Sequence, residues 1–354
     1  MKLMITLPFL IGLLPASASA LEIYNQGGNS LKLGGELAIA EIYAEDRNNV
    51  DGGFSTIDNL SFLNFDFSHQ FNDLWKAGAF IEWGFNAVST GASSTGDAFI
   101  YNRIAKFYFN SPMYGEIGIG KQNSPYHDLA EWTDTFWING GSASGIYDGR
   151  NDPAADGGEA GTGRANDAIT YRYNFMGAEI GLQYQGDQGR SDGDRTSAYQ
   201  VAVEYDSMSL FDIGFSVGAS YNHANYKGQP DSQAWLFGLQ YEDPILYAAA
   251  TYGKYEHFST INGNITNPIG VARDAYGYEI ALGYTIQDYQ LYGGYNHLKD
   301  KNSAAKYAYF VLGASWTYET LIFALEVNLD NKNVSEMGQN NGQNTYGIAM
   351  QYNF

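Results

Sequence analysis

Cysteine is absent from this sequence of 354 residues, proline occurs only 8 times, and no long apolar run follows residue 20. Without cysteine the chain can form neither a disulfide nor a thiolate metal site. No later stretch approaches the ~18 uncharged apolar residues of a spanning helix, which excludes a membrane protein built as a helix bundle. Charged residues make up 16% of the chain, well under the usual level of about a quarter, so the composition is not that of an ordinary soluble enzyme.

Positive charge is especially scarce. The chain has 19 Lys and Arg against 39 Asp and Glu, a net charge of −20. Such an acidic surface argues against a nucleic-acid partner. What the chain has in abundance is aromatic residues, at 16% with 29 Tyr, and glycine, with 42 residues. This combination favours many strands with aromatic girdles.

The first 20 residues are predicted to be a secretory signal peptide. Lys2 forms a short basic region, Leu3 to Leu14 an apolar region, and Ala18-Ser19-Ala20 a small-residue cleavage site. A retained membrane helix is the alternative, but the apolar region is short and Pro8 interrupts it. We therefore expect residues 21–354 to form a single exported domain.

Apolar and polar residues alternate along most of this domain. From Tyr276 to Ile286, the even-numbered positions are large and apolar, and the odd-numbered positions are small or polar. A soluble sandwich would also alternate. These segments, however, run to about ten to fourteen residues, against the usual five or six of globular strands. Aromatic residues recur at their ends, and the minority face suits a wet lumen, so a membrane barrel is favoured.

The connections between these segments alternate in length. Seven are tight, such as Gln287-Asp288, and eight are longer and polar: 46–56, 87–98, 122–165, 187–196, 225–231, 257–273, 300–305 and 331–343. Fifteen connections imply sixteen strands, enough to enclose an aqueous channel. The predicted fold is all-β: a transmembrane antiparallel β-barrel of about 16 strands. Its closing strand is Thr345 to Phe354, with Phe354 on the lipid face.

Enzyme signatures are weak. The five histidines (His69, His127, His223, His257 and His297) are scattered and show no metal spacing. Ser124, His127 and Asp128 are neighbours in sequence only, which does not make a triad. We predict no catalysis, no cofactor and no metal. Strand glycines such as Gly118 mark places where a neighbouring chain approaches closely.

One acidic cluster needs a separate explanation. Asp148, Asp152, Asp156 and Glu159 place four carboxylates within twelve residues of one loop. A calcium site requires rigid convergence of six or more oxygens, which this spacing does not show. A solvated loop face is the preferred interpretation.

Four stretches of the chain resemble one family. They are "EIYNQGGNSLKLGGELA" (22–38), the segment "NRIAKFYF…YGEIGIGKQ" (102–122), "GRANDAITYRYN" (163–174) and the terminal "YNF". Each is similar to the corresponding stretch of the trimeric general porins of Gram-negative outer membranes, especially the enteric matrix-type porins. The layout matches over the whole mature chain, whereas residues 185–345 match in pattern only.

The resemblance implies a pore constriction. In the family, the long third loop folds into the lumen, and its carboxylates face basic wall residues. By position, Arg103 and Arg164 fall where the family has wall arginines, and Asp134 falls where it has the first loop carboxylate. Gly140 and Gly141 match a glycine pair that turns this loop. Residues 122–165, which contain the stretch "WTDTFWINGG" (132–141), would then be the constriction loop.

The chain also departs from the family. Glu36 replaces a basic residue of the first strand, Phe62 or Asn64 replaces an arginine of the second, and Ile138 replaces the second loop carboxylate. The resemblance therefore implies a weaker transverse field and a more aromatic narrow zone. Alternation alone predicts that Arg164 and a further arginine, Arg172, share the inward face of their strand.

These observations predict a passive diffusion channel for small hydrophilic solutes and ions, mildly cation-selective because carboxylates favour cations. Two alternatives stay open: a substrate-specific channel in which Trp132, Phe136 and Trp137 stack on a solute, and an adhesin or structural barrel. The resemblance implies a homotrimer, contact with outer-membrane lipids and lipopolysaccharide, and handling by the barrel-assembly machinery through Phe354. Lys121 and Lys106 are predicted to face outward at the subunit interface, near Glu41.

Overall fold

The computed structural model describes residues 20–45, 52–88, 100–147, 149–150, 156–187, 189, 194–208, 214–261, 271–330 and 344–354. The predicted signal peptide lies outside these residues apart from position 20. Half of loop 187–196, most of loop 257–273 and all of loop 331–343 also lie outside the described residues, as do Asp148 and Asp152 of the acidic cluster.

Strands make up almost all of the regular structure. They are β1 (Leu21–Gln26), β2 (Asn29–Ala44), β3 (Gly53–Asp58), β4 (Phe62–Asn72), β5 (Trp75–Phe85), β6 (Ile100–Ser111), β7 (Gly115–Asn123), β8 (Arg164–Phe175), β9 (Ala178–Gln185), β10 (Arg195–Asp206), β11 (Phe215–Tyr226), β12 (Gln229–Glu242), β13 (Leu246–Glu256), β14 (Asp274–Ile286), β15 (Tyr289–Asp300), β16 (Lys306–Tyr318), β17 (Leu321–Asp330) and β18 (Thr345–Asn353). Among the described residues there is one helix, α1 (Pro125–Ala130), and none long and apolar enough to cross a membrane.

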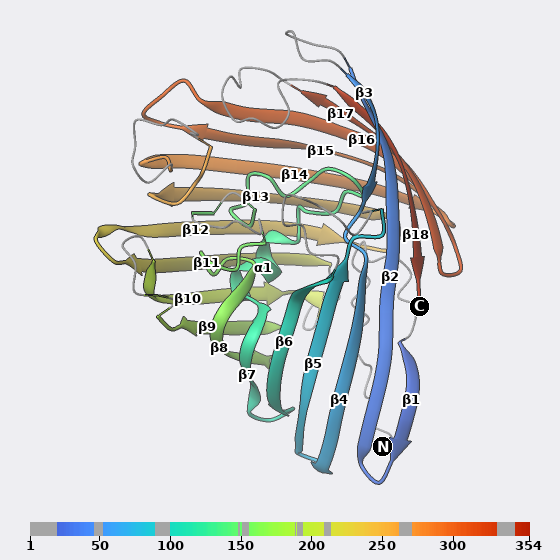
Figure 1. Ribbon diagram of the computed structural model, residues 1–354, viewed down its shortest axis with the longest axis vertical. Helices are drawn as coiled ribbons and strands as arrows, with labels where there is room; N and C mark the ends of the chain where they lie inside the picture. Colours follow the sequence, from blue (N-terminus) through green and yellow to red (C-terminus); the bar gives the residue numbers. More distant parts are fainter. Residues whose placement is uncertain are drawn as a thin grey trace.

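The strands close into one antiparallel ring. Each strand from β4 to β18 pairs with the next, and β18 pairs with β2, for instance through Ala349 and Ala40. β3 and β4 pair with successive parts of β2 and form one wall strand, which bends at Leu60. β1 and β18 also share one position beside β2. The result is a closed barrel of 16 strands, which confirms the predicted fold (Figure 1).

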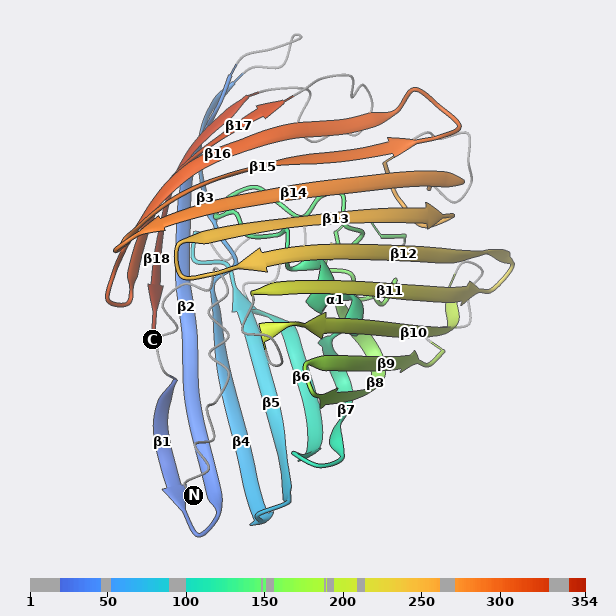
Figure 2. The same cartoon turned by 180° about the vertical axis from the view of Figure 1, so that it is seen from behind.

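Closure depends on the C-terminal residue. The Phe354 amide donates to the Gly35 carbonyl (3.1 Å), and the Gly35 amide donates to the Phe354 carbonyl (2.9 Å). These bonds join the end of β18 to β2 where β1 begins its own pairing. Barrel closure satisfies the backbone groups that an open sheet edge would leave bare in lipid. Seen from behind, β10 to β17 form a continuous curved wall (Figure 2).

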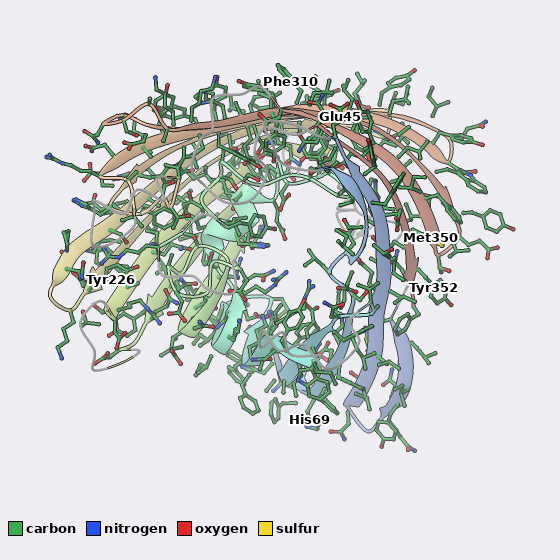
Figure 3. The ribbon with its side chains drawn as sticks, turned by 45° about the horizontal axis from the view of Figure 1, so that its top comes forward. Glu45, His69, Tyr226, Phe310, Met350 and Tyr352 are labelled. Atoms are coloured by element: carbon green, nitrogen blue, oxygen red, sulfur yellow. The ribbon has the colours of Figure 1, made fainter. Side chains whose placement is uncertain are left out.

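The predicted alternation of faces holds along the strands. In β14, Ala275, Gly277 and Glu279 are buried, whereas Ile280 and Leu282 are exposed on the outside. In β18, Ile348, Met350 and Tyr352 are exposed and alternate with Ala349 and Gln351. Met350 and Tyr352 lie on the outer side of the wall in Figure 3. The apolar surface that a soluble protein would bury therefore covers the outside of this barrel.

Three details of the connections differ from the prediction. Residues 225–231 are not a long loop: β11 and β12 are joined by Lys227-Gly228, where Gly228 takes a left-handed φ of 66°. A tight Gly27-Gly28 hairpin also joins β1 to β2 inside the segment predicted as one strand. Helix α1 was not predicted, because six residues are too few for a helical period to be visible in sequence.

A register shift in β6 changes the direction of several side chains. Glu82 of β5 pairs with Ile104, but Trp83 pairs with Asn102, so Arg103 is the extra residue of a bulge. The bulge turns Arg103 inward although it shares parity with the outward Phe107. It also makes the predicted outward position of Lys106 wrong: Lys106 pairs with Glu116 inside the barrel (Nζ to Oε1, 2.9 Å).

Candidate functional site

The described parts of the long connection between β7 and β8, residues 124–147, 149–150 and 156–163, run along the inside of the wall. Its first part is helix α1, which contacts β9 to β12. Ser124 precedes the helix, and its hydroxyl accepts a hydrogen bond from the His127 amide (3.0 Å). Helix α1 lies in front of β11 in Figure 1 and behind it in Figure 2, as expected for a helix on the inner side. We call these described residues the inner segment.

Glycines of the wall make room for this segment. A Cβ added at any of six inward-facing strand glycines would lie within about 2.6 Å of an atom of the inner segment. The pairs are Gly181 with Pro125, Gly218 and Gly238 with Leu129, Gly277 with Ala143, Gly294 with Phe136, and Gly347 with Ile138. The distance from the added Cβ would be 2.4 Å at Gly181 and 2.3 Å at Gly294 and at Gly347. Glycine permits such an approach because it has no side chain. The prediction that strand glycines mark close approach is confirmed for these positions.

A buried carboxylate on β14 holds the middle of the inner segment. Glu279 is fully buried and accepts bonds from the Thr133 hydroxyl (2.6 Å) and the Ala143 amide (2.6 Å). Thr133 also contacts the Thr251 hydroxyl of β13 at 3.0 Å. Hydrogen bonds to a charged acceptor are among the stronger ones in proteins. Glu279 therefore joins two separate parts of the segment to one wall strand.

A second carboxylate, on β17, holds the part around residue 138. Glu326 accepts bonds from the amides of Trp137 (3.0 Å), Ile138 (3.3 Å) and Asn139 (2.7 Å), and from the Asn139 side chain (2.7 Å). Sequence reasoning missed Glu279 and Glu326 as site residues. Their signal was present: each is a carboxylate on the small or polar face of an alternating strand.

Asp134 lies beside the glycine pair of the inner segment. Its carboxylate accepts a bond from the Tyr147 hydroxyl (2.7 Å), and a Cβ on either Gly140 or Gly141 would lie 2.7 Å from it. Gly141 has a left-handed φ of 61°, which glycine adopts without strain. Burial raises the pKa of the Asp134 carboxyl, while the Tyr147 bond and the charge of Arg164 oppose the rise. Asp134 forms no ion pair among the described residues, so it makes no direct bridge to either arginine.

Arg103 is bound to the wall instead of standing free. Its Nε donates to Glu82 Oε1 (2.7 Å), its Nη1 donates to the Leu60 carbonyl (2.9 Å), and its Cζ lies 4.7 Å from the centre of the Phe62 ring. Phe62 is one of the two positions where the family resemblance led us to expect another arginine. Glu82 therefore neutralises the first predicted wall arginine locally.

Arg164 differs from Arg103. It opens β8, and its guanidinium makes no hydrogen bond or ion pair among the described residues. Its charge acts on Asp134, Glu131 and Tyr147 of the inner segment. The charge of Arg164 thus acts on the inner segment without a direct ion pair.

The last two predicted site residues have separate positions. Glu36 faces inward on β2, where the charges of Arg103, Glu82 and Asp58 act on it. Arg172 holds the start of the inner segment: it contacts the Asp128 carboxylate, and its Nη2 donates to the Asn123 carbonyl (2.9 Å). The structure therefore brings Glu36, Arg103 and Arg164 together around one region and places Arg172 beside α1.

The acidic loop cluster makes protein contacts where it is described. Asp156 pairs with Lys121 (2.8 Å), and Glu159 accepts a bond from the Asn166 side chain (3.0 Å). No group of three or more potential metal ligands occurs within the described part of the chain.

Comparison with known proteins agrees with this architecture. A family model described as Gram-negative porin matches residues 9–354. Outer membrane porin F of Xenorhabdus nematophila is 26% identical over 97% of this chain and 96% of its own length. The putative outer membrane porin protein NmpC of Escherichia coli is 26% identical over 82% of this chain and 78% of its own length. Among solved structures, OmpF of Salmonella typhi in complex with daunomycin has a TM-score of 0.77 at 19% identity, covering 94% of this chain and all of that one.

A closed barrel of 16 strands with an apolar outside and a polar inside is a channel protein of the bacterial outer membrane rather than an enzyme. The chain belongs to the Gram-negative porin family.

Proposed function

We propose that this porin conducts small hydrophilic solutes and ions by passive diffusion, and that the inner segment is its constriction. The observation that carries the proposal is the double attachment of the segment to the wall through Glu279 and Glu326. A segment held on several strands of the inner wall narrows the lumen at a constant size. Diffusion through such a pore needs no chemistry and no energy input.

We further propose mild cation selectivity. Around the region that Arg103 and Arg164 share stand the carboxylates of Glu36, Asp58, Glu82, Glu131 and Asp134. Carboxylates thus outnumber guanidiniums there, and acidic pore linings favour cations. An anion-selective porin from Comamonas acidovorans shares the fold at a TM-score of 0.72. Its sequence identity is only 15%, so its ion selectivity does not carry over to this chain.

Planar-bilayer recording tests both statements. In a salt gradient, the reversal potential should have the sign of cation preference, and current should rise linearly with solute concentration without saturation. A reversal potential of the opposite sign would refute cation selectivity, and the absence of conductance would refute the channel itself.

The aromatic residues of the inner segment support diffusion over a substrate-specific track. Trp132 packs against Gly238, Phe136 against Gly294 and Tyr292, and Trp137 against the alanine cluster of β2, β17 and β18. Their faces are turned to the wall, where they hold the segment. Saturable block of the current by a sugar or an aromatic acid at micromolar concentration would favour the track instead.

We propose a homotrimer, with an interface that includes the outer face of β2. Glu41 lies on this face, accepts a bond from Thr56 (2.5 Å) and borders an apolar groove with Leu325 and Ile348. A carboxylate facing lipid is unfavourable, and burial between subunits would relieve it. The Lys121 prediction contributes less, because Asp156 already neutralises that residue. One related structure, OmpT of Vibrio cholerae, is described as a trimer form. Mass determination in mild detergent tests the proposal, and a monomer would refute it.

Lipopolysaccharide contact is proposed at the ends of β14 to β16. Lys299 and Lys306 stand directly opposite each other on the outer face, and Lys301 Nζ lies 6.0 Å from the Tyr276 ring centre. Like charges directly opposite are unfavourable, and lipid phosphates would relieve them. Loss of co-purifying lipopolysaccharide in a Lys299→Gln/Lys306→Gln variant is the expected result.

We also propose that the barrel-assembly machinery reads Phe354. This residue ends β18 on the outer face, and its backbone completes the ring at Gly35. Deletion of Phe354 should lower the amount of assembled barrel in the outer membrane more than it lowers refolding in detergent. Equal losses in both would count against recognition.

A further inference from the structure

Two arginines lie buried on the inner side of the wall, away from the site described above. Arg150 belongs to the returning part of the inner segment, and Arg195 opens β10. Both are among the most buried large side chains of the described residues, with exposures of 0% and 1%. Arginine is seldom fully buried unless its charge and its donors are satisfied. The two residues therefore require a physical explanation.

Arg195 is turned inward by a bulge. The register of β10 against β11 shifts between Arg195 and Ser197, which places Arg195 opposite Tyr226 on the buried face. Its Nε, Nη1 and Nη2 are all buried without a hydrogen-bond partner. The nearest carboxylate oxygen, Asp167 Oδ2, is 3.7 Å from Nη2, beyond hydrogen-bond distance, on a side chain that is 60% exposed.

Arg150 approaches the same tyrosine from the inner segment. Its Cζ lies 3.9 Å from the centre of the Tyr226 ring, a cation–π contact. Its Nη1 donates to the Pro230 carbonyl (2.7 Å), which fixes the plane of the guanidinium. Its Nε and Nη2 are buried and have no partner. Both cations thus meet at Tyr226.

The remaining polar atoms around Tyr226 are hydroxyls. The Tyr226 hydroxyl and Ser232 Oγ of β12 are buried next to each other, and neither has a hydrogen-bond partner outside this pair. The charges of both arginines act on the Tyr226 phenol. Five guanidinium nitrogens without hydrogen-bond partners therefore lie beside the Tyr226–Ser232 hydroxyl pair, in one buried region at the loop end of β10, β11 and β12. Figure 3 shows Tyr226 on this side of the barrel, far from β2.

The carboxylates near this region do not supply the missing hydrogen-bond acceptors. Asp231 acts on Arg150, and Glu159, Asp167 and Asp187 act on Arg195, through their charges. None of them makes a hydrogen bond to either guanidinium among the described contacts. They moderate the positive charge but leave the donors unused, and a buried donor without a hydrogen bond destabilises the fold.

We propose that Arg150, Arg195, Tyr226 and Ser232 form a binding site for a phosphate-class oxyanion. A tetrahedral oxyanion offers several acceptor oxygens and up to two negative charges, which matches two cations with unused donors. The site lies on the inner face of the wall, so a lipid headgroup held in the surrounding bilayer cannot reach it. The ligand is therefore a soluble phosphate or the phosphate group of a small solute. A bound anion would join the returning part of the inner segment to β10.

This inference does not depend on the proposed diffusion function, because binding can be measured without conduction. The test uses full-length mature protein, refolded in detergent without lipopolysaccharide and titrated with inorganic phosphate. Line broadening in ³¹P NMR reports binding, and the thermal unfolding midpoint in phosphate against chloride at matched ionic strength reports stabilisation.

Matched variants assign the effect. Arg195→Gln and Arg150→Gln should each bind phosphate roughly tenfold to a hundredfold more weakly, the range for loss of charge-assisted hydrogen bonds. Arg273→Gln is the control, because Arg273 is an exposed arginine at the same end of the barrel, with a side chain 76% exposed. It should retain wild-type binding. If Arg195→Gln does not fold, Arg195→Lys and Tyr226→Phe provide milder changes that should weaken binding less.

Three results would contradict the proposed site. No phosphate binding by the wild-type protein would overturn the proposal and indicate that ordered water satisfies these donors. Equal weakening in Arg273→Gln would show that phosphate responds only to net charge. Broadening by phosphorylated lipid micelles but not by inorganic phosphate would move the ligand to the outer surface and reject this site.

Discussion

The Glu326 carboxylate of β17 binds Asn139 of the inner segment twice, through the Asn139 amide and through its side chain, each at 2.7 Å. Two residues far apart in the chain, one on the wall and one in a connection, thereby hold the inner segment to the wall. Trp137 and Ile138 donate to the same carboxylate. The four donors of the inner segment, together with the Tyr292 hydroxyl (3.2 Å), make Glu326 a position where a small change should have a large effect.

Glu326→Gln should loosen the inner segment. Glutamine keeps the size but cannot accept from several amides with a full negative charge, and each charge-assisted bond is worth roughly 1.5–3 kcal/mol. We expect single-channel current with more frequent substates and a larger mean conductance. Glu319→Gln, in the tight turn between β16 and β17, is the control and should record as wild type. Identical traces for both variants would show that Glu326 does not hold the segment.

Gly347→Ala should destabilise the barrel through Ile138. The added Cβ would lie 2.3 Å from Ile138 Cδ1, and overpacking of this kind costs roughly 1–3 kcal/mol. Ile138→Val removes that atom and should restore most of the loss in the double variant. Chemical denaturation measures all four proteins. Gly53→Ala, where a Cβ meets nothing within 4 Å, serves as the reference substitution. Additive effects of the two changes would contradict the contact.

Arg164→Gln should increase cation preference. Its guanidinium makes no ion pair among the described residues, so its removal deletes a positive charge without leaving a carboxylate unpaired. Arg103→Gln is the informative comparison, because it leaves Glu82 buried and alone, and we expect it to lower stability as well. Reversal potentials measure the first effect and thermal unfolding measures the second. A shift toward anions in Arg164→Gln would overturn the proposed charge arrangement.

Acidification should weaken cation preference through Asp134. Burial raises the pKa of this carboxyl, so it becomes neutral at a higher pH than the usual ~4. Because the folded-state pKa lies above the unfolded value, ionised Asp134 disfavours the fold at higher pH, and this penalty disappears as pH falls below the unfolded pKa. As the pH is lowered through the raised pKa toward pH 4, protonation of Asp134 should reduce the cation preference measured by the reversal potential. Asp134→Asn should remove this pH-dependent step. Asp243→Asn is the control, since backbone bonds lower the pKa of Asp243. If the Asp134→Asn variant still shows this pH-dependent step, the step belongs to another titrating group.

Several features could be predicted from sequence because they depend only on which face a side chain occupies. The alternation from Tyr276 to Ile286 requires that one face meets lipid and the other meets water, and the structure confirms it. Arg172 follows the same rule, whereas a register shift between Ala165 and Ala168 separates Arg164 from it. The rule fails at Arg103 and Lys106, because one bulge residue reverses the parity of everything beyond it. A bulge depends on the register with a neighbouring strand, and register is not visible in one strand alone.

The same distinction, between features visible in one strand and features set by three-dimensional contacts, applies to the candidate site. Asp134 and the Gly140-Gly141 pair were placed together by sequence resemblance, and the structure places them in contact. The partners of Asp134 and Arg103, which are Tyr147 and Glu82, were not predicted, because hydrogen bonds between distant residues depend on three-dimensional distance. Glu279 and Glu326 were visible as polar residues on an inward face, but nothing in the sequence showed which backbone amides they accept from.

The sequence by itself determined that this chain spans the outer membrane as a barrel. Its two-residue period, its aromatic content and its lack of long apolar runs leave no other way to bury apolar surface and satisfy the backbone in lipid. Only the tertiary structure decided how the inner segment is held and where its charges lie. Those features arise from contacts such as Glu326 with Asn139 and Arg150 with Tyr226, which join residues far apart in the chain.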